Sequence, residues 1–282
     1  MARALVQVTG RLASFALGIA CAAVPLAAQS SDTARAVQRP VFTRHDALVA
    51  SALVAGAVAL MPADDWLRGR VGQPSVQSSA SAHAIANDFS LLGDPGTVIL
   101  TVGTYAVGRI AGNHTVTEVG LHAAEALVAS AVATEFVKGV AGRNRPYLQR
   151  ADADDFLFMN GFTGGGFTSF PSGHTSAAFS LAAVVDEEGG VHWPHAARIV
   201  TPVTYGLASL VGLSRIYKDR HWMSDVAVGA LVGEYSGLIV ERINRRHPHN
   251  VLERWLAPSA VVPVRDTGAH GGTGVMLEWS FR

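Results

Sequence analysis

The chain has 282 residues, with 22 basic and 22 acidic side chains, and this length suits one large domain or two small ones. Its formal net charge of zero indicates no nucleic-acid partner. The single cysteine, Cys21, excludes a disulfide framework and a cysteine-based metal site.

Residues 1–30 have the features of a secretory signal peptide. Arg3 and Arg11 supply a positive start, residues 12–24 are apolar, and small residues near Ala28 provide a cleavage region. Residues 31–45 follow as a polar linker. We therefore expect an exported protein, periplasmic or at the outer side of a membrane. A first membrane helix in place of the signal peptide is the alternative.

Residues 46–250 are predicted to form an all-α bundle of about six helices. Apolar runs between turn residues place these helices at 46–61, 94–110, 117–140, 172–188, 195–213 and 223–244. Pro62 is expected to end the first helix, and residues 63–87 to be irregular or to hold a short surface helix. In the tail, 251–282, alternating residues at 260–265 and 274–281 predict a β-hairpin.

The uncharged runs of these helices are short for membrane spans. The longest, 47–61 and 199–213, have 15 residues each, whereas a span needs roughly 18. Four ionisable side chains in the third and sixth helices are costly in lipid: His122, Glu125, Glu135 and Glu234. Six crossings after a cleaved signal would also place the junction between the third and fourth helices on the cytoplasmic side, which conflicts with an external location of the motifs. A largely soluble domain with peripheral membrane association is favoured, and an integral membrane protein is the alternative.

The tetrapeptide Pro171 to His174 opens the fourth predicted helix. Ser172 is a good N-cap residue, and the free N–H groups of the first turn attract an anion. Gly173 has no Cβ, so an anion can approach its backbone closely. His174 adds a proton donor or acceptor beside the anion. A helix cap with an incidental histidine is the alternative to an anion site here.

Two further motifs place charged residues at the ends of neighbouring helices. Lys138 and Arg145-Pro146 follow the third helix, and Ser214-Arg215 end the fifth. His221 and Asp225 are spaced to share one face of the sixth helix, so the carboxylate can orient the imidazole. In four successive antiparallel helices, all of these ends meet on one side of the bundle.

The three motifs together resemble those of the type 2 phosphatidic acid phosphatase and vanadium haloperoxidase superfamily. The family patterns are Lys-x6-Arg-Pro, Pro-Ser-Gly-His and Ser-Arg-x5-His-x3-Asp, and each is complete here between residues 138 and 225. The resemblance implies an all-α fold with the active site at converging helix ends. It also implies a metal-independent phosphomonoesterase of the acid or lipid phosphate phosphatase type.

By resemblance, His221 is the nucleophile that forms a phosphohistidine, Asp225 orients it, and His174 protonates the leaving oxygen. The phosphoryl group would lie against Lys138, Arg145, Ser172, Gly173 and Arg215. Neighbouring cations and the helix N-terminus lower the pKa of His221, whereas Asp225 raises it, and the sequence leaves the outcome open. Nearby cations outside the motifs are interpreted as solvated charges: Arg143, Arg150, Lys218 and Arg220.

No cluster of histidine and carboxylate residues has convincing metal-ligand spacing, so no metal and no cofactor is expected. Vanadate is expected as an inhibitor that mimics the phosphoryl group. The substrate is a phosphate ester, either lipid-linked or small and soluble. The alternatives are a vanadate-dependent haloperoxidase, in which vanadate is the cofactor, and a non-catalytic relative that binds an anion or a lipid.

Overall fold

The computed structural model describes residues 43–148, 152–246, 260–265 and 273–278. Within residues 43–246 the regular elements are all helical, which confirms the predicted all-α class. The long helices are α2 (Arg44–Val71), α5 (Thr97–Ala111), α6 (His114–Ala141), α7 (Gly173–His192), α8 (Pro194–Tyr217) and α9 (Met223–Arg246). Shorter elements are α3 (Pro74–Gln77), α4 (Ala80–Leu91), the π-helical η1 (Leu92–Gly96) and the 3₁₀-helical η2 (Asn160–Thr163).

The chain divides into two compact units, and the helices belong to the unit Pro40–Leu256. In the other unit, β1 (Ala260–Arg265) and β2 (Thr273–Glu278) pair antiparallel. Ala260 lies opposite Glu278, and Arg265 lies opposite Thr273. This pairing corresponds to the hairpin that the alternating residues predict. The predicted signal peptide and nearly all of the linker lie outside the described residues.

The first part of the bundle differs from the prediction. Pro62 lies inside α2 and does not end it, because α2 continues for more than two turns to Val71. The stretch 63–87, expected to be mostly irregular, is largely helical: it holds the end of α2, α3 and most of α4. Asp94 interrupts the helical backbone between α4 and α5, with φ −160° and ψ 119°. A proline can remain within a helix at the cost of a kink, so composition alone misplaced this boundary.

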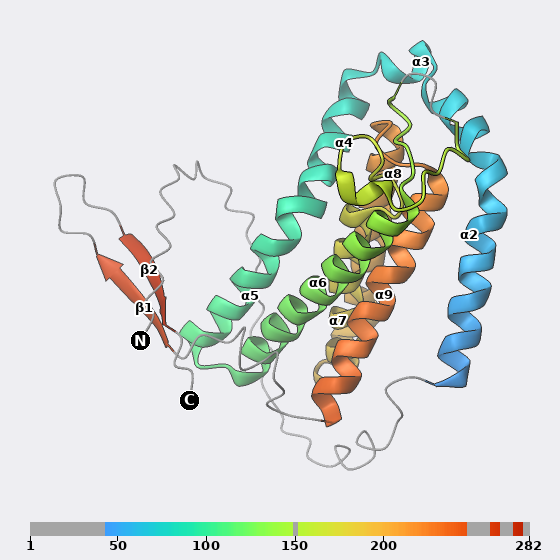
Figure 1. The fold of residues 1–282 in the computed structure, drawn as a ribbon. Helices are drawn as coiled ribbons and strands as arrows, with labels where there is room; N and C mark the ends of the chain where they lie inside the picture. The colour runs from blue at the N-terminus through green and yellow to red at the C-terminus, as the bar shows by residue number, and fades with distance from the viewer. Residues whose placement is uncertain (1–42, 149–151, 247–259, 266–272, 279–282) are drawn as a thin grey trace. The chain divides into compact units, whose positions relative to one another are not determined.

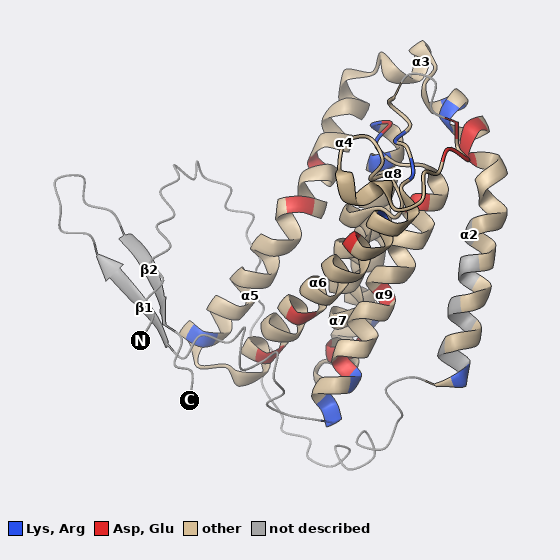
Figure 2. Cartoon of the chain, viewed as in Figure 1, with Lys and Arg blue, Asp and Glu red and all other residues tan. Residues whose placement is uncertain are grey.

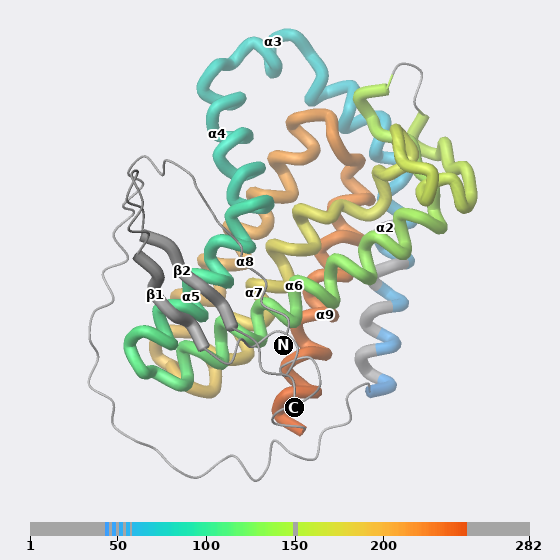
Figure 3. The backbone as a smooth tube through the Cα atoms, turned by 60° about the vertical axis from the view of Figure 1, so that its left-hand side comes forward, coloured from blue at the N-terminus to red at the C-terminus, as the bar shows by residue number. Residues whose placement is uncertain are grey.

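The ends of four helices converge as the sequence predicts. Lys138 and Arg215 lie in the last turns of α6 and α8, and Asp225 lies in the first turn of α9. Figure 1 shows these ends at one side of the bundle, beside the loop between α6 and α7 and below α3. Figure 3, turned by 60°, shows α6, α7 and α9 running side by side away from that loop.

Small residues let α7 and α9 pack closely. A Cβ added to Gly229 would lie 2.5 Å from the backbone oxygen of Ser172, and one at Gly233 would lie 2.1 Å from that of Ser176. Such spacing brings two helix backbones together where bulky residues would keep them apart. Because Ser172 and Gly229 lie at this contact, the first turn of α7 is held against α9 beside His221.

Three helices are long and apolar enough to cross a membrane: α6, α8 and α9. Large apolar side chains are also exposed along several helices, including Ile99, Ile110, Val132, Ile199 and Leu213. These features support association with a membrane. They also weaken the sequence-based preference for a largely soluble domain.

The ionisable side chains that argued against membrane spans are mostly turned inward. Glu125 is 1% exposed, and Glu234 accepts hydrogen bonds from the Tyr205 hydroxyl at 2.7 and 2.9 Å. Charged residues that face a bundle interior and have partners are compatible with a lipid-facing exterior. Counting charges along the sequence could not show on which face of each helix they lie.

Candidate active site

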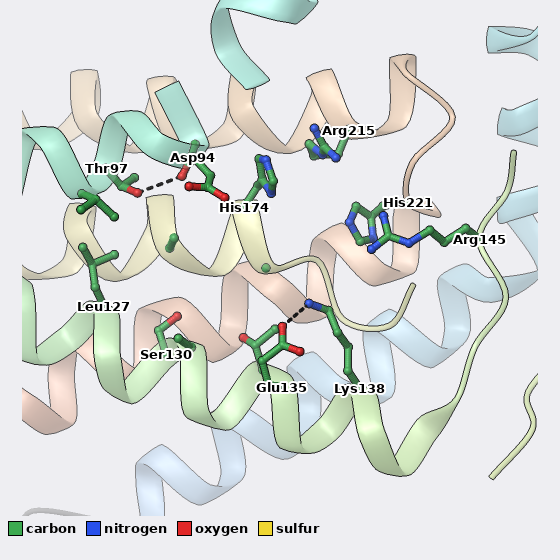
Figure 4. Close-up of a pocket in the computed structure, with 16 residues that line it drawn as sticks. Asp94, Thr97, Leu127, Ser130, Glu135, Lys138, Arg145, His174, Arg215 and His221 are labelled. Carbon is green, nitrogen blue, oxygen red and sulfur yellow. Dashed lines mark hydrogen bonds and ion pairs between the residues drawn. The ribbon is translucent and has the colours of Figure 1, made fainter. Parts of the chain in front are cut away.

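A pocket of about 340 Å³ lies where α5, α6, α7 and α8 approach one another. Six of the eight predicted site residues line it: Lys138, Arg145, Gly173, His174, Arg215 and His221. Figure 4 shows Arg145 reaching toward His221, Lys138 of α6 pairing with Glu135, and His174 and Arg215 on the neighbouring helices. Three cations and two imidazoles thus surround one cavity, an arrangement suited to a phosphoryl group.

Glycines hold the loop after α6 against the end of that helix. Gly142 has the left-handed φ of 59° that ends α6, and its N–H donates to the Lys138 carbonyl at 3.0 Å. A Cβ at Gly142 or at Gly161 would overlap backbone oxygens of the packed loop. This packing fixes the last turn of α6, from which the Lys138 ammonium reaches the pocket and pairs with Glu135 at 2.5 Å.

The two arginines that line the pocket are held by hydroxyl groups. Arg145 Nε donates to the Thr168 hydroxyl at 3.3 Å, and its Nη2 donates to the Thr168 carbonyl at 3.2 Å. Arg215 Nη1 donates to the Ser90 hydroxyl of α4. Arg215 Nε is buried and has no hydrogen-bond partner within the described parts of the chain. An oxyanion in the pocket would complete the hydrogen bonding of this guanidinium.

His174 lines the pocket from the first turn of α7. Burial, reinforced by Arg215, His221, Lys138 and Arg145, lowers its pKa to about 3. Without an anion, His174 is therefore neutral at pH 7. A phosphate dianion would offset the surrounding positive charge and raise this pKa toward the range of a proton donor.

His221 is 3% exposed and turns Nδ1 away from the pocket. Nδ1 lies 2.7 Å from the Ser169 carbonyl, to which it donates, and 3.5 Å from Asp225 Oδ2. These acceptors leave Nε2 unprotonated in the neutral ring. Burial lowers the pKa of His221 although Asp225 acts in the opposite direction, so the neutral form is favoured. The sequence had left this balance open.

Asp225 does not line the pocket and organises the residues around His221. Its Oδ2 accepts from the Ser169 hydroxyl at 2.5 Å and from the Trp222 N–H at 2.9 Å. Its Oδ1 accepts from Arg143 at 2.6 Å. The carboxylate therefore fixes the segment that carries the Ser169 carbonyl, which is the nearer partner of the imidazole.

Arg143 was interpreted as a solvated charge, and this interpretation is wrong. Its side chain is fully buried and pairs with Asp225 and, at 2.8 Å, with Asp64 of α2. Its Nη1 also donates to the Ser224 hydroxyl at 2.7 Å. Asp64 accepts from the Ser224 N–H at 3.0 Å. Neither Arg143 nor Asp64 belongs to a motif. Asp64 was also missed because the first helix was expected to end at Pro62.

Ser172 is also placed differently from the prediction. It is the residue before α7, but its side chain makes no capping hydrogen bond, and it does not line the pocket. Its hydroxyl accepts from Thr175 at 2.9 Å, and its N–H donates to the Asp225 carbonyl at 3.0 Å. Gly173, in contrast, lines the pocket: a Cβ there would lie 3.3 Å from the Lys138 ammonium.

A family model for the PAP2 superfamily matches residues 120–248. This segment contains Lys138, Arg145, His174, Arg215 and His221, which the structure gathers around the pocket. Over residues 120–248 the chain is therefore similar to the PAP2 superfamily. The resemblance inferred from the three motifs is thereby confirmed for this segment.

Two curated relatives align with part of this chain. Lipid A 1-phosphatase of Porphyromonas gingivalis is 43% identical over 81 residues, which cover 27% of this chain and 17% of the relative. Probable diacylglycerol pyrophosphate phosphatase 1 of Schizosaccharomyces pombe is 39% identical over 84 residues, covering 27% of this chain and 30% of the relative. The chain thus spans less than a third of the length of either relative.

Two solved structures align with part of the chain. LpxE of Aquifex aeolicus has a TM-score of 0.44 and 23% identity, covering 58% of this chain and 87% of that one. A transmembrane PAP2-type phosphatidylglycerolphosphate phosphatase of Bacillus subtilis has a TM-score of 0.34 and 20% identity. It covers 68% of this chain and 98% of its own.

Proposed function

We propose that this protein is a phosphatase that hydrolyses a lipid phosphate ester through a phosphohistidine. The observation that carries this proposal is the pocket itself. It combines three cations, a neutral histidine with a free Nε2 and a second histidine at a helix N-terminus.

In the first step, Nε2 of His221 attacks phosphorus while the bond to the ester oxygen breaks. The Ser169 carbonyl, whose segment is held by Asp225, accepts a hydrogen bond from Nδ1–H and stabilises the positive charge that develops on the ring. Lys138, Arg145 and Arg215 bind the equatorial oxygens, where charge spreads in the transition state. His174, protonated once the dianion is bound, gives its proton to the leaving oxygen.

In the second step, the neutral His174 accepts a proton from a water molecule that attacks phosphorus. The P–N bond breaks, inorganic phosphate leaves, and His221 returns to the neutral form with Nδ1 protonated. None of these steps needs a metal, because the cations of the pocket supply the charge that Mg²⁺ supplies in other phosphoryl-transfer sites. We therefore expect hydrolysis to persist in EDTA.

The apolar side of the pocket favours a lipid substrate. Val98, Leu127, Ala131 and Ala177 line it together with the cations, and Val98 is itself half exposed on α5. An alkyl chain could lie along this face while the phosphate reaches Arg215. The names of the two curated relatives, both phosphatases of lipid substrates, support the same class.

We further propose that the pocket end of the bundle faces the outer side of the membrane. The test uses the Cys21→Ala protein with one new cysteine, at exposed Gln73 near the pocket or at exposed His195 at the other end. A membrane-impermeant maleimide should label the Gln73→Cys variant in intact cells and spare the His195→Cys variant. The reverse pattern would contradict this orientation.

The function is tested with a substrate panel on purified protein in detergent. Long-chain phosphatidic acid should be hydrolysed with a higher kcat/KM than p-nitrophenyl phosphate, because only the lipid uses the apolar lining. The activity should survive EDTA. Peroxide-dependent bromide oxidation by the vanadate-loaded protein, with no hydrolysis of any ester, would favour a haloperoxidase instead.

A further inference from the structure

A second group of ionisable side chains lies at the end of the bundle away from the phosphate pocket. His122 comes from the first half of α6, Glu188 from the last turns of α7 and Glu241 from the last turns of α9. Each offers one ligand atom, and these three atoms lie within 4.8 Å of one another. Figure 2 shows acidic positions toward this end of the helices.

The distances within this group match the spacing of ligands around one ion. His122 Nδ1 lies 2.9 Å from Glu188 Oε1 and 3.4 Å from Glu241 Oε1. Two atoms that each bind Zn²⁺ at about 2.0–2.1 Å in a tetrahedral site are about 3.3 Å apart. His192 Nε2 lies 3.1 Å from Glu188 Oε2 and places a second imidazole at the solvent side.

Glu241 supplies an independent indication of a bound cation. Its side chain is fully buried, yet neither carboxylate oxygen has a hydrogen-bond partner within the described residues. Arg245 lies 3.9 Å away and pairs more closely with Glu187, at 2.9 Å. A buried carboxylate without hydrogen bonds is costly unless a charge is bound to it. A lone imidazolium at His122, 2.9 Å from Glu188 and 3.4 Å from Glu241, would supply one positive charge for two buried carboxylates.

We propose that His122, Glu188 and Glu241 bind a divalent transition-metal ion, with His192 as a further ligand. One or two imidazoles with carboxylates suit Zn²⁺ or Mn²⁺, and the absence of sulfur ligands disfavours softer ions. The ion would neutralise two buried carboxylates and join α6, α7 and α9 at this end. It stabilises the bundle and takes no part in hydrolysis, because the reacting groups lie at the other end.

The experiment uses the full-length protein in detergent, stripped with EDTA and then incubated with Zn²⁺ or, separately, Mn²⁺. After desalting, elemental analysis should find about one ion per chain for one of these metals. The same metal should raise the unfolding midpoint by about 5 °C when present at a hundred times its Kd. Glu241→Gln should abolish both effects.

Glu234→Gln is the matched control, because Glu234 is a half-buried carboxylate on the same helix that pairs with Tyr205 instead. This variant should bind metal and gain stability as the wild type does. Should Glu241→Gln fold poorly, His192→Gln gives a second test at the more exposed ligand, with a weaker Kd expected. The proposal is overturned if the wild type retains neither metal, or if Glu241→Gln retains as much as the wild type.

Discussion

The two ends of the bundle carry charged clusters of opposite sign, although α6 and α7 contribute residues to both. At the pocket end, the lining contains the cations Lys138, Arg145 and Arg215. The carboxylates in the same lining are Asp94 and Glu135. At the other end, α6, α7 and α9 bring buried carboxylates against one imidazole. One end thus favours an anion and the other a cation.

The comparison shows how helix direction and local partners together set the chemistry. At the pocket end, α7 begins, so free N–H groups add to the positive charge. At the other end, α7 terminates, and its last carbonyls add negative charge near Glu188. The direction of α7 therefore reinforces the sign of the side chains at each end, and substitutions at each end can test this separation of charge.

The largest effect should come from removing the nucleophile. His221→Ala should lower kcat by at least about a thousandfold, because it removes the proposed nucleophile of the first step. Glu241→Gln, at the opposite end, should leave kcat within about twofold when assayed well below its unfolding midpoint. Steady-state hydrolysis of one lipid phosphate by both variants measures the contrast. Wild-type turnover by His221→Ala would remove His221 from the mechanism.

The next largest effect concerns the buried guanidinium. Arg143→Ala should lower the free energy of unfolding by about 3–5 kcal/mol, because it leaves Asp64 and Asp225 buried without their cation. Chemical denaturation measures this loss, and the exposed Arg198→Ala is the control with little expected effect. A loss under 1 kcal/mol for Arg143→Ala would contradict the buried network.

The positions of site residues could be predicted from the sequence where the residues belong to a short local motif. The helix-end positions of Lys138, His174 and His221 follow from apolar runs and turn residues alone. Arg143 and Asp64 are separated by almost eighty positions, and nothing local distinguishes Arg143 from a surface charge. Only tertiary packing reveals that α2 extends past Pro62 and delivers Asp64 to the site.

The cluster at the other end escaped prediction for a related reason. His122, Glu188 and Glu241 lie on three helices, and metal-ligand spacing can be recognised only within one segment. The role of Ser172 was misjudged differently: its position before α7 is as predicted, but its hydroxyl accepts from Thr175 instead of facing the pocket. The backbone trace follows from periodicity, whereas the direction of one side chain depends on its neighbours.

A smaller effect should distinguish the two histidines of the pocket. His174→Ala should reduce hydrolysis of alkyl phosphates about a hundredfold more than that of aryl phosphates, whose leaving groups need less protonation. The ratio of the two kcat values for wild type and variant measures this difference. Equal losses on both substrates would leave His174 without the role of general acid.

The smallest effect is on the pH dependence of stability. In the unfolded chain His174 takes up a proton near pH 6.5, but in the folded protein its pKa is about 3. The unfolded state therefore binds more protons between these values, and His174 destabilises the fold progressively as the pH falls from 6.5 to 3. His174→Gln should reduce this decline, measured by denaturation at pH 7 and pH 5. An unchanged pH dependence would mean that the pKa of His174 is not depressed.

Chemical trapping of the intermediate tests the central claim most directly. Protein mixed with ³²P-labelled lipid phosphate and denatured within milliseconds should carry a label that is stable in alkali and lost in acid, as a phosphoramidate is. His174→Ala, given a labelled aryl phosphate, should accumulate more of this label, because the second step lacks its base. His221→Ala should carry none. An alkali-labile label, or one that persists in His221→Ala, would contradict the phosphohistidine mechanism.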